Sequence, residues 1–304
     1  MSTRKVILTV APTGGFATKA HNPYVPTQPE EIAADVKRCH DAGASVAALH
    51  ARRPDDQATC DGNIYRRMNE LIRRRCDIVI NNSTGGGING DMVPDDDTAL
   101  CEVSWEARLS GLEGGADICT MDAITFTAAM GGREVLMNTP PSRCREMAKL
   151  MKVRGIKPEW EAFSPTHLLQ DSRTLIAEGF DTAPYCFNIC LGLDRMFQGA
   201  LPYTPKILQW MVDLLPAQSI FNVSAIGPDH LHAITHTLLL GGHIRVGLED
   251  YLFYAPGDLA SNVRMVERAV RIIRELGMEP ATSQEAREML GLAALVRDVE
   301  GGRP

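Results

Sequence analysis

Short apolar segments rich in β-branched residues alternate with longer amphipathic segments along almost the whole chain. Apolar runs of this length, bounded by turn residues, are typical of buried strands. Eight strands are predicted, near Val6–Val10, Ser45–His50, Ile78–Asn81, Asp117–Met121, Pro158–Ala162, Tyr185–Leu191, Ser219–Val223 and His243–Val246.

The segments between these strands carry apolar residues every three or four positions, which is the spacing of one helix face. They predict helices near Glu30–Ala42, Gly62–Arg74, Thr98–Ser110, Ser142–Arg154, Thr166–Glu178, Pro205–Leu214 and Asp229–Leu240. Two more helices, near Leu259–Leu276 and Gln284–Leu290, follow the last strand. Capping boxes are predicted at Thr27-x-x-Glu30 and Thr282-x-x-Glu285.

Strands that alternate with helices predict a parallel sheet with right-handed crossovers. Eight such units close more naturally into a barrel than into an open sheet, so the predicted fold class is α/β, a (β/α)8 TIM barrel. The 304 residues fit one such domain, spanning residues 1–304 with a C-terminal helical extension.

The composition narrows the classes of partner. The formal net charge is −7 and no Lys/Arg cluster stands out, which argues against a nucleic acid or an anionic membrane as partner. No apolar stretch is long enough to span a bilayer, and the N-terminal apolar run breaks at Pro12, too early for a signal peptide. The eight cysteines are scattered without a Cys-x-x-Cys pair, so we expect a cytoplasmic protein with reduced thiols.

In barrels of this kind, chemistry occurs where the strands end. The stretch Asn82-Ser83-Thr84-Gly85-Gly86-Gly87 follows the third strand. Its backbone N–H groups and hydroxyls could bind an anion, although a flexible loop explains the same residues equally well. The stretch is neither a Walker loop nor a dinucleotide fingerprint.

Ionisable side chains follow the fifth and eighth strands. Arg245 could bind a carboxylate through two hydrogen bonds, and Glu249 and Asp250 could be metal ligands, bases or partners of the arginine. An ion-pair network at the barrel rim is the structural alternative for these residues, and also for Glu159 and Glu161.

A histidine, His50, ends the second strand, where it is as often a core residue as a ligand. Ala48 lies two residues earlier on the same strand face, so no His-x-His pair exists there. His232 and His236 share one face of a predicted outer helix, a position that makes a metal site there improbable.

Together these segments resemble the β-keto acid cleavage enzymes, the family of 3-keto-5-aminohexanoate cleavage enzyme, over nearly the whole chain. The similar pieces are Ala11-Pro-Thr-Gly14, Pro26-Thr-Gln-Pro-Glu-Glu31, Asp41-Ala-Gly-Ala44, Ser83-Thr-Gly-Gly86, Ile156-Lys-Pro-Glu-Trp-Glu161, Gly241-Gly-His-Ile-Arg-Val-Gly-Leu-Glu-Asp250 and Glu285-Ala-Arg-Glu-Met-Leu-Gly291. The resemblance implies a (β/α)8 barrel, usually a homotetramer, with a divalent metal that is typically zinc. It also implies condensation of a β-keto acid with acetyl-CoA, followed by retro-Claisen cleavage to acetoacetate and a new acyl-CoA.

The resemblance also implies roles for individual residues. His50 and Glu249 match metal ligands, and Arg245 and Asp250 match a catalytic dyad. Ser83 matches a substrate-binding serine, and Glu161 a carboxylate that arranges or deprotonates the substrate. The other residues expected at the substrate are Thr13, Gly14, Phe16, Arg53, Thr84, Gly85, Gly86 and Thr125, the last beside Ile124 where the family has glycine.

Three departures from the family pattern change the expectations. Ala48 replaces the first metal-binding histidine, which leaves two of three protein ligands and predicts weak metal binding or a site completed by water. Arg53 replaces an acidic residue, and could supply some of the missing positive charge. Phe16 replaces a glutamate that could pair with a substrate ammonium, so 3-keto-5-aminohexanoate is not the expected substrate.

Two other functions are compatible with these residues. One is a lyase or aldolase-type barrel that works without CoA, although no lysine at a strand end suggests a Schiff base. The other is a catalytically silent relative that binds an acyl-CoA or keto acid. Ala48 favours the silent relative, whereas Ser83, Arg245, Glu249 and Asp250 favour an enzyme.

Overall fold

The computed structural model describes residues 3–93, 100–130 and 132–294. Within these residues, eight parallel strands form one sheet whose spatial order follows the chain. They are β2 (Leu8–Val10), β3 (Val46–Leu49), β6 (Val79–Asn82), β8 (Ile118–Met121), β11 (Lys157–Ala162), β12 (Tyr185–Leu191), β13 (Ser219–Ala225) and β14 (Ile244–Val246).

The sheet closes into a barrel. β14 pairs with β2 in parallel, and the remaining seam between β13 and β14 is bridged by the His243 N–H, which donates to the Phe221 carbonyl at 2.7 Å. The predicted (β/α)8 barrel is therefore confirmed. The first predicted strand is divided, because Lys5–Val6 (β1) leaves the barrel to pair with Glu279–Pro280 (β17).

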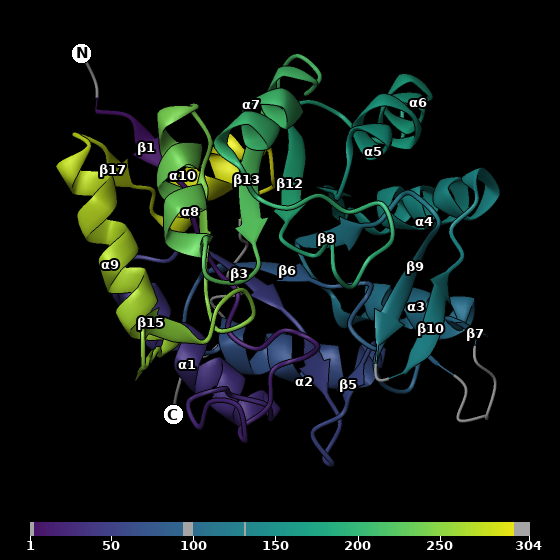
Figure 1. Cartoon of the computed structure of the whole chain (residues 1–304), viewed down its shortest axis with the longest axis horizontal. Helices are drawn as coiled ribbons and strands as arrows, with labels where there is room; N and C mark the ends of the chain where they lie inside the picture. Colours follow the sequence, from purple (N-terminus) through teal and green to yellow (C-terminus); the bar gives the residue numbers. More distant parts are fainter. Residues whose placement is uncertain (1–2, 94–99, 131, 295–304) are drawn as a thin grey trace, which may run out of the picture.

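Helices surround the barrel (Figure 1). They are α1 (Pro29–Asp41), α2 (Gly62–Arg73), α4 (Pro141–Arg154), α7 (Pro205–Asp213), α8 (His230–Leu239) and α9 (Asn262–Glu275). The helix predicted near Thr166–Glu178 is divided into α5 (Pro165–Leu169) and α6 (Asp171–Ala177).

The helix predicted near Thr98–Ser110 was wrong in its first half. The helix α3 covers only Trp105–Ser110, and Leu100–Glu102 forms strand β7. Thr98 and Ala99 lie outside the described residues. β7 joins β10 (Arg133–Met137) and β9 (Phe126–Met130) in a small sheet. These strands form because they pair with one another, and the local spacing of apolar residues does not predict them.

Smaller strand pairs complete the described structure. A hairpin joins β4 (Ala51–Arg52) to β5 (Ala58–Thr59), and another joins β15 (Phe253–Ala255) to β16 (Asp258–Leu259). Among the residues that the structure describes, no helix has both the length and the apolarity needed to cross a membrane.

The amino ends of the strands are closed by α10 (Ser283–Met289). Ala286 and the following Leu290 belong to one buried apolar cluster with Ile7, Val46 and Ile118 from the barrel strands. Because this end is filled by side chains, the carboxyl ends of the strands are left for a functional site.

Only one of the two predicted capping boxes has the predicted register. At α10, Glu285 N–H donates to Thr282 Oγ1 (3.2 Å), and Thr282 N–H donates to Glu285 Oε2 (2.8 Å). At α1 the prediction was wrong by one residue, because the helix begins at Pro29 and it is Glu31 that accepts from the backbone N–H of Gln28 (3.2 Å).

Candidate active site

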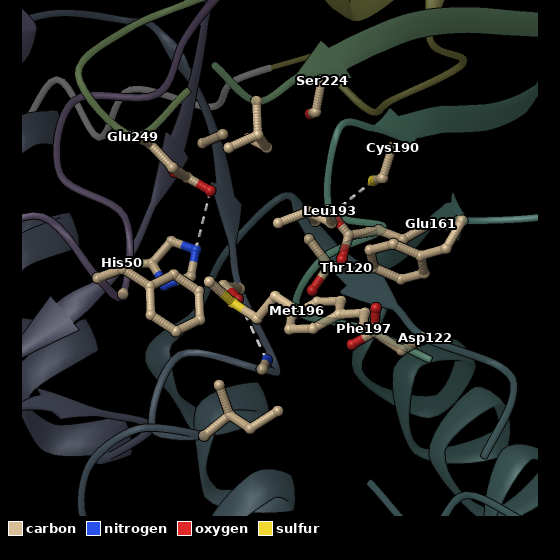
Figure 2. A pocket seen from close by; sticks show the side chains of 18 of the residues that line it. His50, Thr120, Asp122, Glu161, Cys190, Leu193, Met196, Phe197, Ser224 and Glu249 are labelled. Atoms are coloured by element: carbon tan, nitrogen blue, oxygen red, sulfur yellow. Dashed lines mark hydrogen bonds and ion pairs between the residues drawn. The ribbon is translucent and has the colours of Figure 1, made fainter. Parts of the chain in front are cut away.

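A cavity of about 190 Å³ opens at the carboxyl ends of the barrel strands. Seven strand ends and the loop after β14 bring polar side chains to it: His50, Asn81, Ser83, Thr120, Asp122, Glu161, Cys190, Ser224, Arg245 and Glu249. Figure 2 shows His50 and Glu249 on one side of the cavity, and Glu161, Thr120 and Asp122 on the other.

The central cation is Arg245, which is 4% exposed. Its Nε and Nη2 donate to the two carboxylate oxygens of Asp250 at 3.1 and 2.9 Å, and Nη2 also lies 2.6 Å from Glu249 Oε1. Burial alone would lower the pKa of Arg245, but the charges of Asp250 and Glu249 outweigh this effect and raise the pKa well above its usual value. The guanidinium therefore stays charged and keeps a fixed orientation.

The carboxylate of Glu249 links the arginine to His50. Its Oε1 lies 3.3 Å from His50 Nε2, while its buried Oε2 has no hydrogen-bond partner among the described residues. Burial would raise the pKa of Glu249, but Arg245 and His50 lower it. This close packing requires Gly14, whose φ is +65° and where a Cβ would lie 2.6 Å from Glu249 Cγ.

The donor set does not fit a catalytic zinc site with three protein ligands. His50 and Glu249 supply two donors. Ala48, two residues before His50 on the same strand face, also lines the cavity, but its methyl group cannot bind a metal. Glu249 also shares Oε1 with the guanidinium of Arg245. Within the described part of the chain, no group of three His, Cys, Asp or Glu side chains is arranged to hold a metal ion.

The opposite side of the cavity carries the carboxyl groups of Glu161 and Asp122. The pKa of Glu161 is raised well above its usual value by burial and by the neighbouring Asp122 and Glu159. Glu161 Oε1 accepts from Asn188 Nδ2 at 3.1 Å. A carboxyl group with a raised pKa can accept and return a proton near neutral pH.

The charge of Asp122 is balanced by Arg108, which sequence reasoning missed. Arg108 lies on α3, is 1% exposed, and places Nη2 3.1 Å from Asp122 Oδ2. Its Nη1 donates to Thr139 Oγ1 at 2.6 Å. An arginine on an outer helix gives no sequence signal that it is buried. Asp122, in contrast, directly follows the fourth predicted strand, and that position could have identified Asp122 as a site residue.

Among the residues predicted from the glycine-rich loop, Ser83 and Gly85 line the cavity. The Gly85 N–H donates to Ser83 Oγ at 3.1 Å, which orients the hydroxyl. Thr84 and Gly86 are not among the lining residues. The Thr84 hydroxyl instead donates to the Thr120 carbonyl at 2.9 Å.

Four other residues predicted at the substrate also lie outside the cavity lining: Thr13, Gly14, Arg53 and Thr125. The Thr13 hydroxyl donates to a backbone carbonyl at 2.9 Å, and Thr125 Oγ1 accepts a backbone N–H at 2.9 Å. Arg53 forms a surface ion pair with Asp55 at 2.5 Å. Arg53 therefore does not supply the missing positive charge at His50 in this structure.

Phe16, in contrast, lines the cavity and is 39% exposed. It is accompanied by apolar side chains that sequence reasoning did not identify: Ile88, Phe126, Met137, Phe163, Leu193, Met196, Phe197 and Ile226. They come from loops and from β9 and β10, so no single local pattern marks them.

Comparison with known proteins identifies the fold and the family of this chain. The structure superposes on the apo structure of ObcA with a TM-score of 0.69 at 18% identity, covering 90% of this chain and 66% of that chain. A 3-keto-5-aminohexanoate cleavage enzyme of Acetoanaerobium sticklandii is 33% identical over 95% of this chain and 99% of its own length. A 3-dehydrocarnitine:acetyl-CoA trimethylamine transferase of Rhizobium meliloti is 32% identical over 95% of this chain and 97% of its own length. Residues 5–292 match the beta-keto acid cleavage enzyme family, and the chain belongs to that family.

Proposed function

We propose that this protein condenses a β-keto acid with acetyl-CoA and releases acetoacetate and a new acyl-CoA. The observation that carries the proposal is the buried guanidinium of Arg245, which faces the cavity between Glu249 and Asp250. Its charge can stabilise both an anionic keto acid and the enolate that forms from it. The names of relatives that use acetyl-CoA support the choice of co-substrate.

The reaction balances in two steps. The carbon between the carboxylate and the ketone loses a proton and attacks the acetyl carbonyl, so a C–C bond forms and the thioester C–S bond breaks. The released CoA thiolate then attacks the original ketone. The old C–C bond breaks, the acyl-CoA forms, and the acetoacetate enolate takes up a proton.

In this scheme each residue has a defined task. Arg245 binds the negative charge that develops on the substrate, and Asp250 is a positioning residue that holds the guanidinium through two hydrogen bonds. Glu161, with its raised pKa, transfers the proton to and from the carbon. Ser83 contributes a hydroxyl that is available to a substrate oxygen.

No step requires the metal that the family resemblance implies. We propose that added zinc binds weakly to His50 and Glu249, with water molecules as its remaining ligands. Zinc that stays stoichiometric after dialysis, measured by elemental analysis, would contradict this. The resemblance also leads us to propose a single-domain, cytoplasmic homotetramer, and light scattering of the purified protein tests the subunit count.

The reaction is tested by incubating the purified protein with acetyl-CoA and a panel of β-keto acids, with and without zinc. Acetoacetate that appears only when both substrates are present supports the proposal. Product formed without acetyl-CoA would instead indicate a CoA-independent lyase. Ligand-induced shifts in melting temperature without any turnover would indicate a silent binding protein.

A further inference from the structure

One end of the cavity is lined by apolar side chains from loops outside the barrel. Phe126, Phe163 and Phe197 form its wall, with ring centroids 5.0 Å apart for Phe126–Phe197 and 5.5 Å apart for the other two pairs. All three rings are at most 9% exposed, and Met137, which is 2% exposed, lies beside them in the lining. We name these three phenylalanines the aromatic wall.

Backbone hydrogen bonds hold this wall in place. The loop after β12 carries Met196 and Phe197 and adds to the edge of β9. Ala129 N–H donates to the Met196 carbonyl, and Gln198 N–H donates to the Thr127 carbonyl, both at 2.8 Å. The wall is therefore present before any substrate arrives, which limits the groups that fit against it.

The charges near the wall are already balanced. Arg108 pairs with Asp122, and burial together with Asp122 and Glu159 raises the pKa of Glu161, which disfavours its charged form. Arg245, on the barrel side, shares its charge between two carboxylates. A charged group placed against the aromatic wall would lose its hydration and find no free counter-charge among the described lining residues.

We propose that the acyl end of the β-keto acid is uncharged and apolar, an alkyl or aryl group that packs against the aromatic wall. This inference rests on the proposed function, in which the keto and carboxylate oxygens lie toward Arg245. It adds the class of substrate: neutral 3-oxo acids rather than amino-substituted or dicarboxylic ones.

The alternative occupant of this apolar space is the pantetheine arm of acetyl-CoA. That arm is long and polar at its amides, so it must extend toward solvent. Phe16, which also lines the cavity, is 39% exposed, whereas the phenylalanines of the aromatic wall are at most 9% exposed. The position of the wall therefore favours the acyl group of the keto acid.

The test compares three β-keto acids with the same six-carbon backbone and different acyl ends. The end is uncharged in 3-oxohexanoate, an ammonium in 3-keto-5-aminohexanoate and a second carboxylate in 3-oxoadipate, and we call them the neutral, cationic and anionic acids after the charge of that end. With saturating acetyl-CoA, we expect kcat/KM for the neutral acid to exceed that for either charged acid by about 100-fold, because an unpaired charge is costly to bury. Equal or faster turnover of a charged acid overturns the inference.

Binding of each acid, measured by calorimetry without acetyl-CoA, separates this inference from the proposed function. If none of the acids is turned over but the neutral acid alone binds, the proposed reaction fails and the assignment of the apolar end stands. If all three bind with similar affinity, the assignment fails whatever the turnover.

Variants of half-buried Met196 add a direct probe of the lining. Met196→Glu should raise the ratio of kcat/KM for the cationic acid over the neutral acid by about tenfold, since it supplies a counter-charge. Met196→Gln, similar in size but neutral, should leave the ratio unchanged. An effect of Met196→Glu on the KM for acetyl-CoA, with no change in the ratio, would assign the apolar end to CoA and overturn the inference.

Discussion

Replacing Arg245 by methionine removes the positive charge that two buried carboxylates share. The side chains of Glu249 and Asp250 are 17% and 0% exposed, and both lie within 3 Å of the guanidinium. Removing one partner of a buried ion pair costs about 3–5 kcal/mol, because the remaining charge must be neutralised or left unpaired. We expect Arg245→Met to lower the free energy of unfolding by that amount.

The same change should reduce activity for a second reason. Truncating a buried charge that binds an anion costs about 2–5 kcal/mol, which corresponds to a loss of about 30- to 5,000-fold in kcat/KM. Arg245→Lys keeps the charge but not the two-point hydrogen bond to Asp250, so its loss should be smaller.

A double variant separates folding from catalysis. Arg245→Met with Asp250→Leu removes the arginine and one of its two carboxylate partners, leaving Glu249 beside His50, and apolar replacement of a buried pair is often neutral for stability. We expect urea unfolding to show that the double variant regains at least half of the lost stability, while acetoacetate formation stays as low as in Arg245→Met. A double variant with wild-type kcat/KM would refute the catalytic role of Arg245, and a single variant as stable as wild type would refute the reasoning on charge burial.

Gly14→Ala should abolish most activity and cost about 2–4 kcal/mol, because its Cβ would lie 2.6 Å from Glu249 Cγ at a φ of +65°. Gly155→Ala, at a φ of +67° with nothing within 4 Å, is the matched control and should cost only about 1–2 kcal/mol in thermal unfolding. Ala48→His should restore a third metal ligand, so this variant should retain zinc after dialysis where the wild-type protein loses it; equal zinc content in the two proteins would contradict the assignment of the ligands. Burial and, less strongly, Arg4 lower the pKa of His243 to about 4, so the unfolded chain binds the proton first as the pH falls. His243 should therefore contribute about 3 kcal/mol of stability at pH 7 that is lost by pH 4. Urea titrations at each pH should show this loss for the wild-type protein and not for His243→Gln.

Much of the candidate site could be predicted because parallel strands end at one edge of their sheet. His50, Ser83, Glu161 and Arg245 lie at or near the ends of four different predicted strands, and once the strands close into a barrel their side chains must surround one opening. The strand pattern alone therefore placed them near one another, without any knowledge of distances.

Other parts of the site had no local signal. Arg108 lies on an outer helix, where an arginine is normally expected to be exposed, yet it is buried against Asp122. The small sheet of β7, β9 and β10 was missed because its strands are short and are stabilised by pairing with one another. That sheet carries Phe126, and the loop that pairs with it carries Phe197.

The sequence by itself determined the order of strands and helices, the positions where strands end, and the replacement of one expected metal ligand by Ala48. These are local properties, set by the spacing of apolar residues and by the identity of single side chains. Only the tertiary structure decided which charges neutralise each other around Arg245 and Asp122, and that three distant phenylalanines form one wall. Electrostatic and packing energies depend on distances between side chains, and distances between segments far apart in the chain exist only after folding.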